Sequence, residues 1–143
     1  MTLIFLDFDG VLRRKTAPLY NLENHLVRSF EEQMRQFTEV KIVITSSWRE
    51  VYKLRKLQSL FTEDIGERIV GLTPISNSRE GYYRHREVLA YLRRQSDAES
   101  RWLAIDDDAE HYPQDAPVLL VDPQLGLDAL NTERLRLWLT VNS

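Results

Sequence analysis

The sequence predicts an α/β fold, a single doubly wound parallel sheet of about five strands with helices on both faces. Five short apolar runs alternate with segments in which apolar residues recur at helical spacing. The runs are continuously apolar, as in strands that are covered on both faces of a parallel sheet. The 143 residues show no repeat or linker, so we expect one domain over residues 1–143.

Polar residues follow most of the expected strands, which cover residues 3–8, 41–45, 69–72, 102–105 and 118–121. In Rossmann-like sheets of this kind, ligands bind beyond the carboxyl ends of the strands. We therefore expect the chemistry at these ends. The residues there are Asp7 and Asp9, Thr45 and Ser46, Thr73, Asp106 and Asp107, and Asp122.

Helical spacing of apolar residues predicts helices over residues 22–37 and 84–94. The capping box from Ser47 to Glu50 predicts another helix that runs to about residue 60. A last helix should begin at Asn131 or Thr132, either of which can cap it.

Composition excludes several classes of protein. The absence of Cys excludes a disulfide scaffold, a Cys-based zinc site and a thiol nucleophile, and it suits a cytoplasmic location. No apolar run approaches the length of a membrane span, and the N-terminus lacks a secretory signal, so we expect no membrane contact. The net charge of −3 argues against general nucleic-acid affinity. A basic stretch over 79–94 beside an acidic one over 97–133 suits an anionic ligand held partly through a cation.

Asp7 and Asp9 are two residues apart, so on an extended chain they point the same way. At a strand end they can supply a nucleophile and a proton donor near one metal ion. Their mutual repulsion requires a cation or a shared proton, and Gly10 permits the chain to turn directly after them. A calcium-binding EF-hand loop does not fit, because Val11 and Leu12 stand where further oxygen ligands are needed.

Two further strand ends carry polar clusters. Thr45 and Ser46 precede a helix N-terminus, where hydroxyls and free amides can seat a phosphate. We assign the helix cap to Ser47, which leaves both residues for a ligand. Asp106 and Asp107 follow a buried strand, and adjacent buried carboxylates are costly without a cation. Mg²⁺ suits them, because it takes one or two carboxylates and a phosphate oxygen.

These segments resemble motifs of the haloacid dehalogenase (HAD) superfamily. Residues 5–12, FLDFDGVL, resemble its first motif, and residues 43–46 and 105–107 resemble its second and fourth. Order and spacing agree over nearly the whole chain. Residues 45–49, 71–74 and 102–107 further resemble a small bacterial HAD group that is also found as a domain in RNA-repair proteins.

The resemblance implies a HAD-like phosphatase that uses Mg²⁺. Asp7 would attack a phosphoryl group to form an aspartyl-phosphate, and Asp9 would protonate the leaving group and then activate water. Thr45 would bind the phosphoryl oxygens. The metal ligands would be Asp7, the backbone carbonyl of Asp9 and Asp106, with Asp107 assisting.

The third HAD motif is usually a Lys, and this chain has no Lys after Lys56. Arg84 stands in the corresponding pattern and would bridge the phosphate and Asp7, with Arg86 as the alternative. The residues expected to contact the substrate are Gly10, Ser46, Arg49 and Arg86.

The superfamily inserts substrate-selecting caps at two places, which here hold residues 11–21 and 73–83. Both are as short as ordinary loops, so we expect no cap domain and an open site. A phosphorylated macromolecule, such as a nucleic-acid end, could then cover the site itself. The basic residues Arg13, Arg14 and Lys15, with Trp48 and Arg49 opposite, would meet it first.

There are three alternatives to a small-molecule phosphatase. A response-regulator receiver domain is disfavoured, because it requires an Asp after its third strand, where this chain has Thr73. A catalytically weak phosphate-binding module would keep the fold without the usual Lys. A nucleic-acid end-processing phosphatase would use the same chemistry, with basic segments on the phosphate backbone. The physiological substrate and the oligomeric state stay open.

Overall fold

The computed structural model, which describes residues 1–95 and 100–143, contains a five-stranded parallel sheet of order β3-β2-β1-β4-β5. The strands are β1 (Thr2–Leu6), β2 (Lys41–Ile44), β3 (Ile69–Leu72), β4 (Arg101–Asp106) and β5 (Val118–Leu120). The chain winds outward from β1 in one direction and then returns to β4 to wind in the other. The carboxyl ends of β1 and β4 therefore flank the switch point where ligands bind in such sheets, and the predicted fold class is confirmed.

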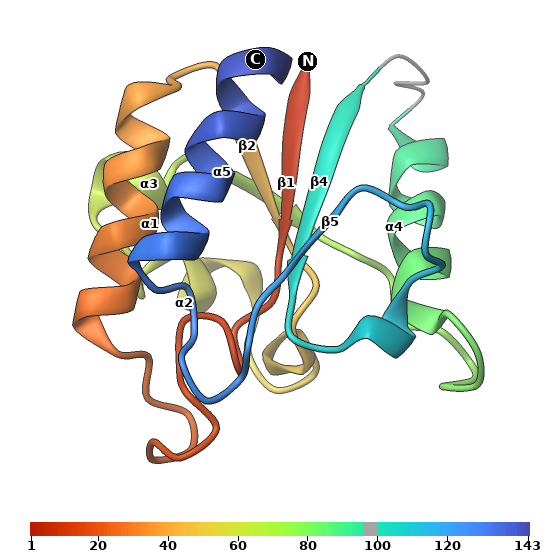
Figure 1. The fold of residues 1–143 in the computed structure, drawn as a ribbon. Helices are drawn as coiled ribbons and strands as arrows, with labels where there is room; N and C mark the ends of the chain where they lie inside the picture. Colours follow the sequence, from red (N-terminus) through yellow and green to blue (C-terminus); the bar gives the residue numbers. More distant parts are fainter. Residues whose placement is uncertain (96–99) are drawn as a thin grey trace.

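Helices cover both faces of the sheet (Figure 1). Helices α1 and α5 lie on one face and α4 on the other, while both chain termini lie at the edge opposite the carboxyl ends of the strands. The helices are α1 (Asn24–Gln36), α2 (Leu54–Gln58), α3 (Glu63–Gly66), α4 (Tyr83–Arg94) and α5 (Ala129–Asn142), with 3₁₀ turns η1 (Ser47–Glu50) and η2 (Ala109–His111).

The core has one layer on each side of the sheet. Ile4 and Leu6 of β1 belong to the larger layer, under α1 and α5, whereas Leu3 and Phe5 belong to the layer under α4. Side chains alternate along a strand, so both faces of β1 are buried. This explains why the strand is a continuous apolar run.

The helix predicted over residues 47–60 is wrong as a single element. It is replaced by η1 and α2, and the hydroxyl that accepts the amide of Trp48, at 3.2 Å, belongs to Ser46 and not to Ser47. The tight turn buries Trp48 against Phe8, with ring centroids 5.2 Å apart in an edge-to-face contact. This packing between distant segments outweighs the local helical pattern.

The last helix also begins earlier than predicted. Asp128 caps α5 by accepting the amide of Asn131 at 3.0 Å, and Asn131 and Thr132 lie inside the first turn. An acidic cap suits the partial positive charge at a helix N-terminus.

The described residues form no cap domain. The segments between β1 and α1 and between β3 and α4 carry no helix or strand, and they lie as loops at the carboxyl edge of the sheet (Figure 1). The carboxyl edge of the sheet is therefore open above the strand ends.

Among the helices described here, none combines the length and the apolar character that crossing a membrane requires.

Candidate active site

Three carboxylates from two neighbouring strands meet at the switch point. Asp7 follows β1, and Asp106 and Asp107 stand at the end of β4, whose Ile105 pairs with Leu6. One oxygen of each carboxylate lies within 4.8 Å of the other two, and Asp7 and Asp106 are almost fully buried. The acidic pairs that the sequence places far apart are thus brought together.

The carboxylates disfavour one another's charge. Burial raises the pKa of Asp7 well above its usual range, and Asp106 raises it further, although Arg84 and the amide of Phe8, at 2.8 Å, oppose this. Burial also raises the pKa of Asp107. Three carboxylate oxygens this close together fit a hard divalent ion such as Mg²⁺.

Gly10 allows the first loop to approach these carboxylates. Its φ of +81° lies in the left-handed region, and a Cβ placed there would stand 2.3 Å from an Asp107 oxygen. Only glycine fits both constraints. The turn that the sequence predicts at this residue therefore also makes room for Asp107.

Asp9 lies at the mouth of the site and is held on one side. Its Oδ1 accepts hydrogen bonds from Nε of Arg13, at 2.9 Å, and from the indole Nε1 of Trp48, at 3.1 Å. Its Oδ2 has no hydrogen-bond partner within residues 1–95 and 100–143. One oxygen is thus fixed while the other remains available to a ligand.

The basic segment expected to meet the substrate is only partly exposed, and that expectation is wrong for Arg13, which lies inside the protein, whereas Arg14 is half-exposed. Arg13 is buried on Asp9, and Arg14 pairs with Glu23 at 2.7 Å. Lys15 is also half-exposed but has a different partner, since its ammonium lies 3.5 Å from an Asp107 oxygen. Lys15 is therefore the residue of this segment that faces the carboxylates.

Thr45 and Ser46 end β2 beside Asp7 but differ in their contacts. The amide of Thr45 donates to the carbonyl of Leu6 at 3.0 Å, and its buried hydroxyl has no partner in the described part of the chain. The Ser46 hydroxyl accepts the amide of Trp48 and so caps η1 in place of Ser47, which leaves the Ser46 O–H as the group that could donate to a ligand. An unpartnered buried hydroxyl is costly, and a ligand oxygen would satisfy that of Thr45.

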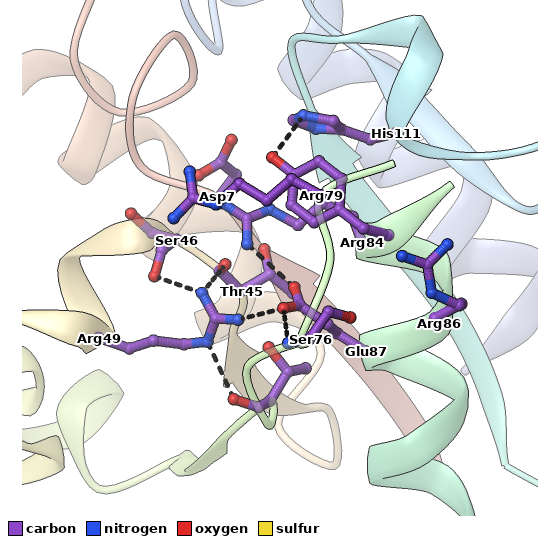
Figure 2. Close-up of polar contacts among 12 residues, drawn as sticks. Asp7, Thr45, Ser46, Arg49, Ser76, Arg79, Arg84, Arg86, Glu87 and His111 are labelled. Atoms are coloured by element: carbon purple, nitrogen blue, oxygen red, sulfur yellow. Dashed lines mark hydrogen bonds and ion pairs between the residues drawn. The ribbon is translucent and has the colours of Figure 1, made fainter. Parts of the chain in front are cut away.

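Arg84, and not Arg86, lies in the site. Arg84 is 5% exposed, donates from Nη1 to Glu87 at 3.0 Å, and leaves its buried Nε without a partner among the described residues. Burial alone would lower the pKa of Arg84, but Asp7 and Glu87 outweigh it and raise that pKa. Arg86 is exposed, donates to the carbonyl of Ser78 at 3.0 Å, does not line the cavity above Asp7 and lies apart from Asp7 (Figure 2).

Arg49, expected to bind substrate, is instead used to hold loops together (Figure 2). A guanidinium has five N–H groups, and those of Arg49 all face partners within the protein. The partners are the carbonyl oxygens of Thr45, Ser46, Thr73 and Pro74 and the carboxylate of Glu87. With no donor left for a substrate, Arg49 joins the loops after β2 and β3 to α4.

Glu87 is a residue of the site that the sequence analysis missed. It is 3% exposed and contacts Arg49 at 2.8 Å, Arg84 at 3.0 Å and the amide of Ser76 at 2.8 Å. It holds Arg84 facing Asp7. The i,i+3 spacing from Arg84 was a signal for this pairing.

His111, in η2, was also missed. Its Nδ1 lies 3.0 Å from both oxygens of Asp106, and its Nε2 lies 3.1 Å from the hydroxyl of Tyr83. This chain of contacts fixes the orientation of the Asp106 carboxylate. No local sequence pattern marks a lone His five residues after the acid that it contacts.

Some of these side chains, among them Lys15, Arg84 and His111, line a cavity of about 220 Å³ above Asp7. Asp122, at the end of the fifth predicted strand, is not among them, because its carboxylate is exposed and accepts the amide of Gln124 at 2.8 Å. The cavity combines carboxylates with three cationic side chains, which suits an anion bound together with a metal ion. Its charged residues are Asp7, Asp9, Lys15, Arg79, Arg84, Asp107 and Asp108.

Comparison with known proteins agrees with this arrangement. The family model described as "HAD domain in Swiss Army Knife RNA repair proteins" matches residues 3–131. This span includes all the site residues described above and all five strands, apart from the first residue of β1. No curated protein and no solved structure gives a significant match. The family match covers most of the chain, including the carboxylates that meet at the switch point, so the chain belongs to the HAD domains of Swiss Army Knife RNA repair proteins.

Proposed function

We propose that this domain is a Mg²⁺-dependent phosphomonoester hydrolase that acts through an aspartyl-phosphate on Asp7. The observation that carries the proposal is the cluster of Asp7, Asp106 and Asp107, with Arg84 lining the same cavity as Asp7 and Asp107. A phosphate there would meet a nucleophile, a cation and an unpartnered hydroxyl on Thr45.

The chemistry follows from the two first-loop acids. A carboxylate oxygen of Asp7 attacks phosphorus, the bond from phosphorus to the ester oxygen breaks, and Asp9 gives that oxygen its proton. Asp9, now ionised, takes a proton from water. The water oxygen attacks phosphorus, which releases inorganic phosphate and restores the Asp7 carboxylate.

Other residues stabilise the charge that develops on the phosphoryl oxygens. Arg84 supplies a fixed positive charge, and the Thr45 hydroxyl donates a hydrogen bond from the end of β2. Bound at Asp7, Asp106 and Asp107, Mg²⁺ would supply a Lewis acid that neutralises the carboxylates and the phosphoryl group.

We further propose that the substrate is a phosphorylated nucleic-acid end. The family's occurrence in RNA repair proteins supports this, as does a site that no cap domain closes. Lys15 adds positive charge at the rim of the cavity. A polymer end can cover such an open site, whereas a small metabolite would leave it exposed to water.

The test measures phosphate release from a small phosphomonoester and from oligonucleotides with 5′- or 3′-terminal phosphate, in Mg²⁺ and in EDTA. We expect Mg²⁺-dependent turnover that Asp7→Asn lowers at least roughly a thousandfold. Asp115→Asn is the matched control, because Asp115 is exposed and outside the cavity. Phosphate binding without turnover in the parent protein would refute the hydrolase and support a phosphate-binding module.

A further inference from the structure

A second cavity adjoins the one above Asp7. It measures about 550 Å³, and Arg79, Tyr83, Asp108 and His111 line both cavities. A ligand with its phosphate at Asp7 therefore extends past these side chains into the second cavity. That volume lies in the range of small-molecule sites.

The wall between the two cavities is fixed by contacts. The hydroxyl of Tyr83 lies 3.1 Å from Nε2 of His111, and their rings meet edge to face with centroids 5.0 Å apart. His111 is held in turn by Asp106. The wall between the cavities is thus connected through His111 to a residue of the carboxylate cluster.

The second cavity offers an aromatic surface. Tyr82 is 49% exposed, immediately precedes α4, and makes no side-chain hydrogen bond within the residues that the structure describes. An exposed aromatic ring next to a phosphate site is a platform on which a nucleic-acid base can stack.

The charges of the second cavity disfavour another phosphate. Asp108 and Glu110 are acidic, and Arg79, its one basic side chain apart from His111, already pairs with Glu50 at 3.0 Å. The carboxylate of Glu110 has no partner in residues 1–95 and 100–143. A free carboxylate beside a phosphate site is suited to accept hydrogen bonds from ribose hydroxyls.

We propose that this second cavity binds the terminal nucleoside of the substrate and favours RNA over DNA. Tyr82 stacks on the base, and Glu110 accepts a hydrogen bond from a ribose hydroxyl. The proposal rests on the proposed function, since it places the terminal phosphate of the same substrate at Asp7. It adds that the sugar is recognised by a carboxylate and not by a basic surface.

The test measures binding, so that it does not depend on turnover. In the Asp7→Asn background, fluorescence anisotropy compares single-stranded RNA and DNA of one sequence, each with a terminal phosphate. Tyr82→Ala should weaken binding of both roughly tenfold, while Tyr82→Phe, which keeps the ring, should bind like the parent. Glu110→Ala should weaken the binding of RNA roughly fivefold or more and leave the binding of DNA unchanged. Glu32→Ala, an exposed acid on α1, is the matched control.

The outcomes separate the two proposals. If Tyr82→Ala binds both strands like the parent, or Glu110→Ala affects RNA and DNA equally, the nucleoside site is overturned whatever the catalytic result. If the expected binding pattern appears while the parent with Asp7 intact releases no phosphate, the hydrolase fails and the nucleoside site stands. Thermal unfolding of each variant verifies that it is folded.

Discussion

Replacing Asp7 with Asn should stabilise the metal-free protein at neutral pH, although it removes the proposed nucleophile. The Asp7 carboxylate is buried beside Asp106 and Asp107, and burial together with Asp106 raises its pKa well above the ordinary value. Its charge is therefore unfavourable in the folded state when no cation is bound. Asn keeps the shape of the side chain and removes that charge.

The size of the effect follows from the spacing of the carboxylates. Their nearest set of oxygens lies within 4.8 Å, and at an effective dielectric constant of about 20 two unit charges that far apart repel by about 3.5 kcal/mol. Attraction from Arg84 and the hydrogen bond from the Phe8 amide offset part of this repulsion. We expect a net gain of about 1–2 kcal/mol in the free energy of unfolding.

The effect has a defined pH dependence. A raised pKa means that folded protein holds the Asp7 proton more tightly than the unfolded chain, so the parent is favoured at low pH. As pH rises from the ordinary value of 3.8 through the raised pKa, the parent loses stability relative to Asp7→Asn. Urea denaturation of both proteins across this range, in EDTA, measures the difference.

Mg²⁺ should reverse the order of stability and make the parent protein more stable than Asp7→Asn. A ligand that binds the folded state at a hundredfold its Kd adds about 2.7 kcal/mol, and the parent has one more ligand charge than the variant. Asp9→Asn is the control, because Asp9 holds Arg13 and Trp48 and its loss should destabilise the protein. An Asp7→Asn protein less stable than the parent in EDTA at neutral pH would refute the argument from repulsion.

Two further predictions concern α4. Arg84→Ala should lower kcat for a phosphomonoester roughly a hundredfold or more, and Arg84→Lys should keep part of the activity, because Arg84 lies in the cavity with Asp7. The exposed Arg86→Ala should leave kcat nearly unchanged, and the reverse ranking in steady-state kinetics would assign the third-motif role to Arg86. Glu87→Gln should cost about 3 kcal/mol in urea denaturation, since it leaves two buried guanidinium groups without their shared carboxylate. A loss below about 1 kcal/mol would show that the network is readily rearranged.

The polar strand ends were predictable from sequence, because each is marked by a local change from apolar to polar residues. A buried apolar run followed at once by Asp7, by Thr45 or by Asp106 is visible without any long-range information. The topology of a parallel sheet then brings such ends to one edge. The carboxylate cluster of the site follows from this rule and needs no knowledge of side-chain contacts.

The contacts among charged side chains were not predictable in the same way. Arg49 and Arg13 look like exposed basic residues in the sequence, yet both are buried on oxygen acceptors that the fold brings to them. His111 reaches Asp106 only because η2 turns back over the end of β4. Which charge is paired depends on tertiary distances, and helical or strand periodicity does not encode them.

The position of Arg49 has a consequence for how the site opens. The buried guanidinium of Arg49 donates to the loops after β2 and β3 and to Glu87 of α4. Detaching any one of these segments would leave a buried charge without its partner or expose it to solvent. The segments should therefore separate together in a single cooperative opening. A ligand that contacts only one of the three segments would therefore slow the opening of all of them.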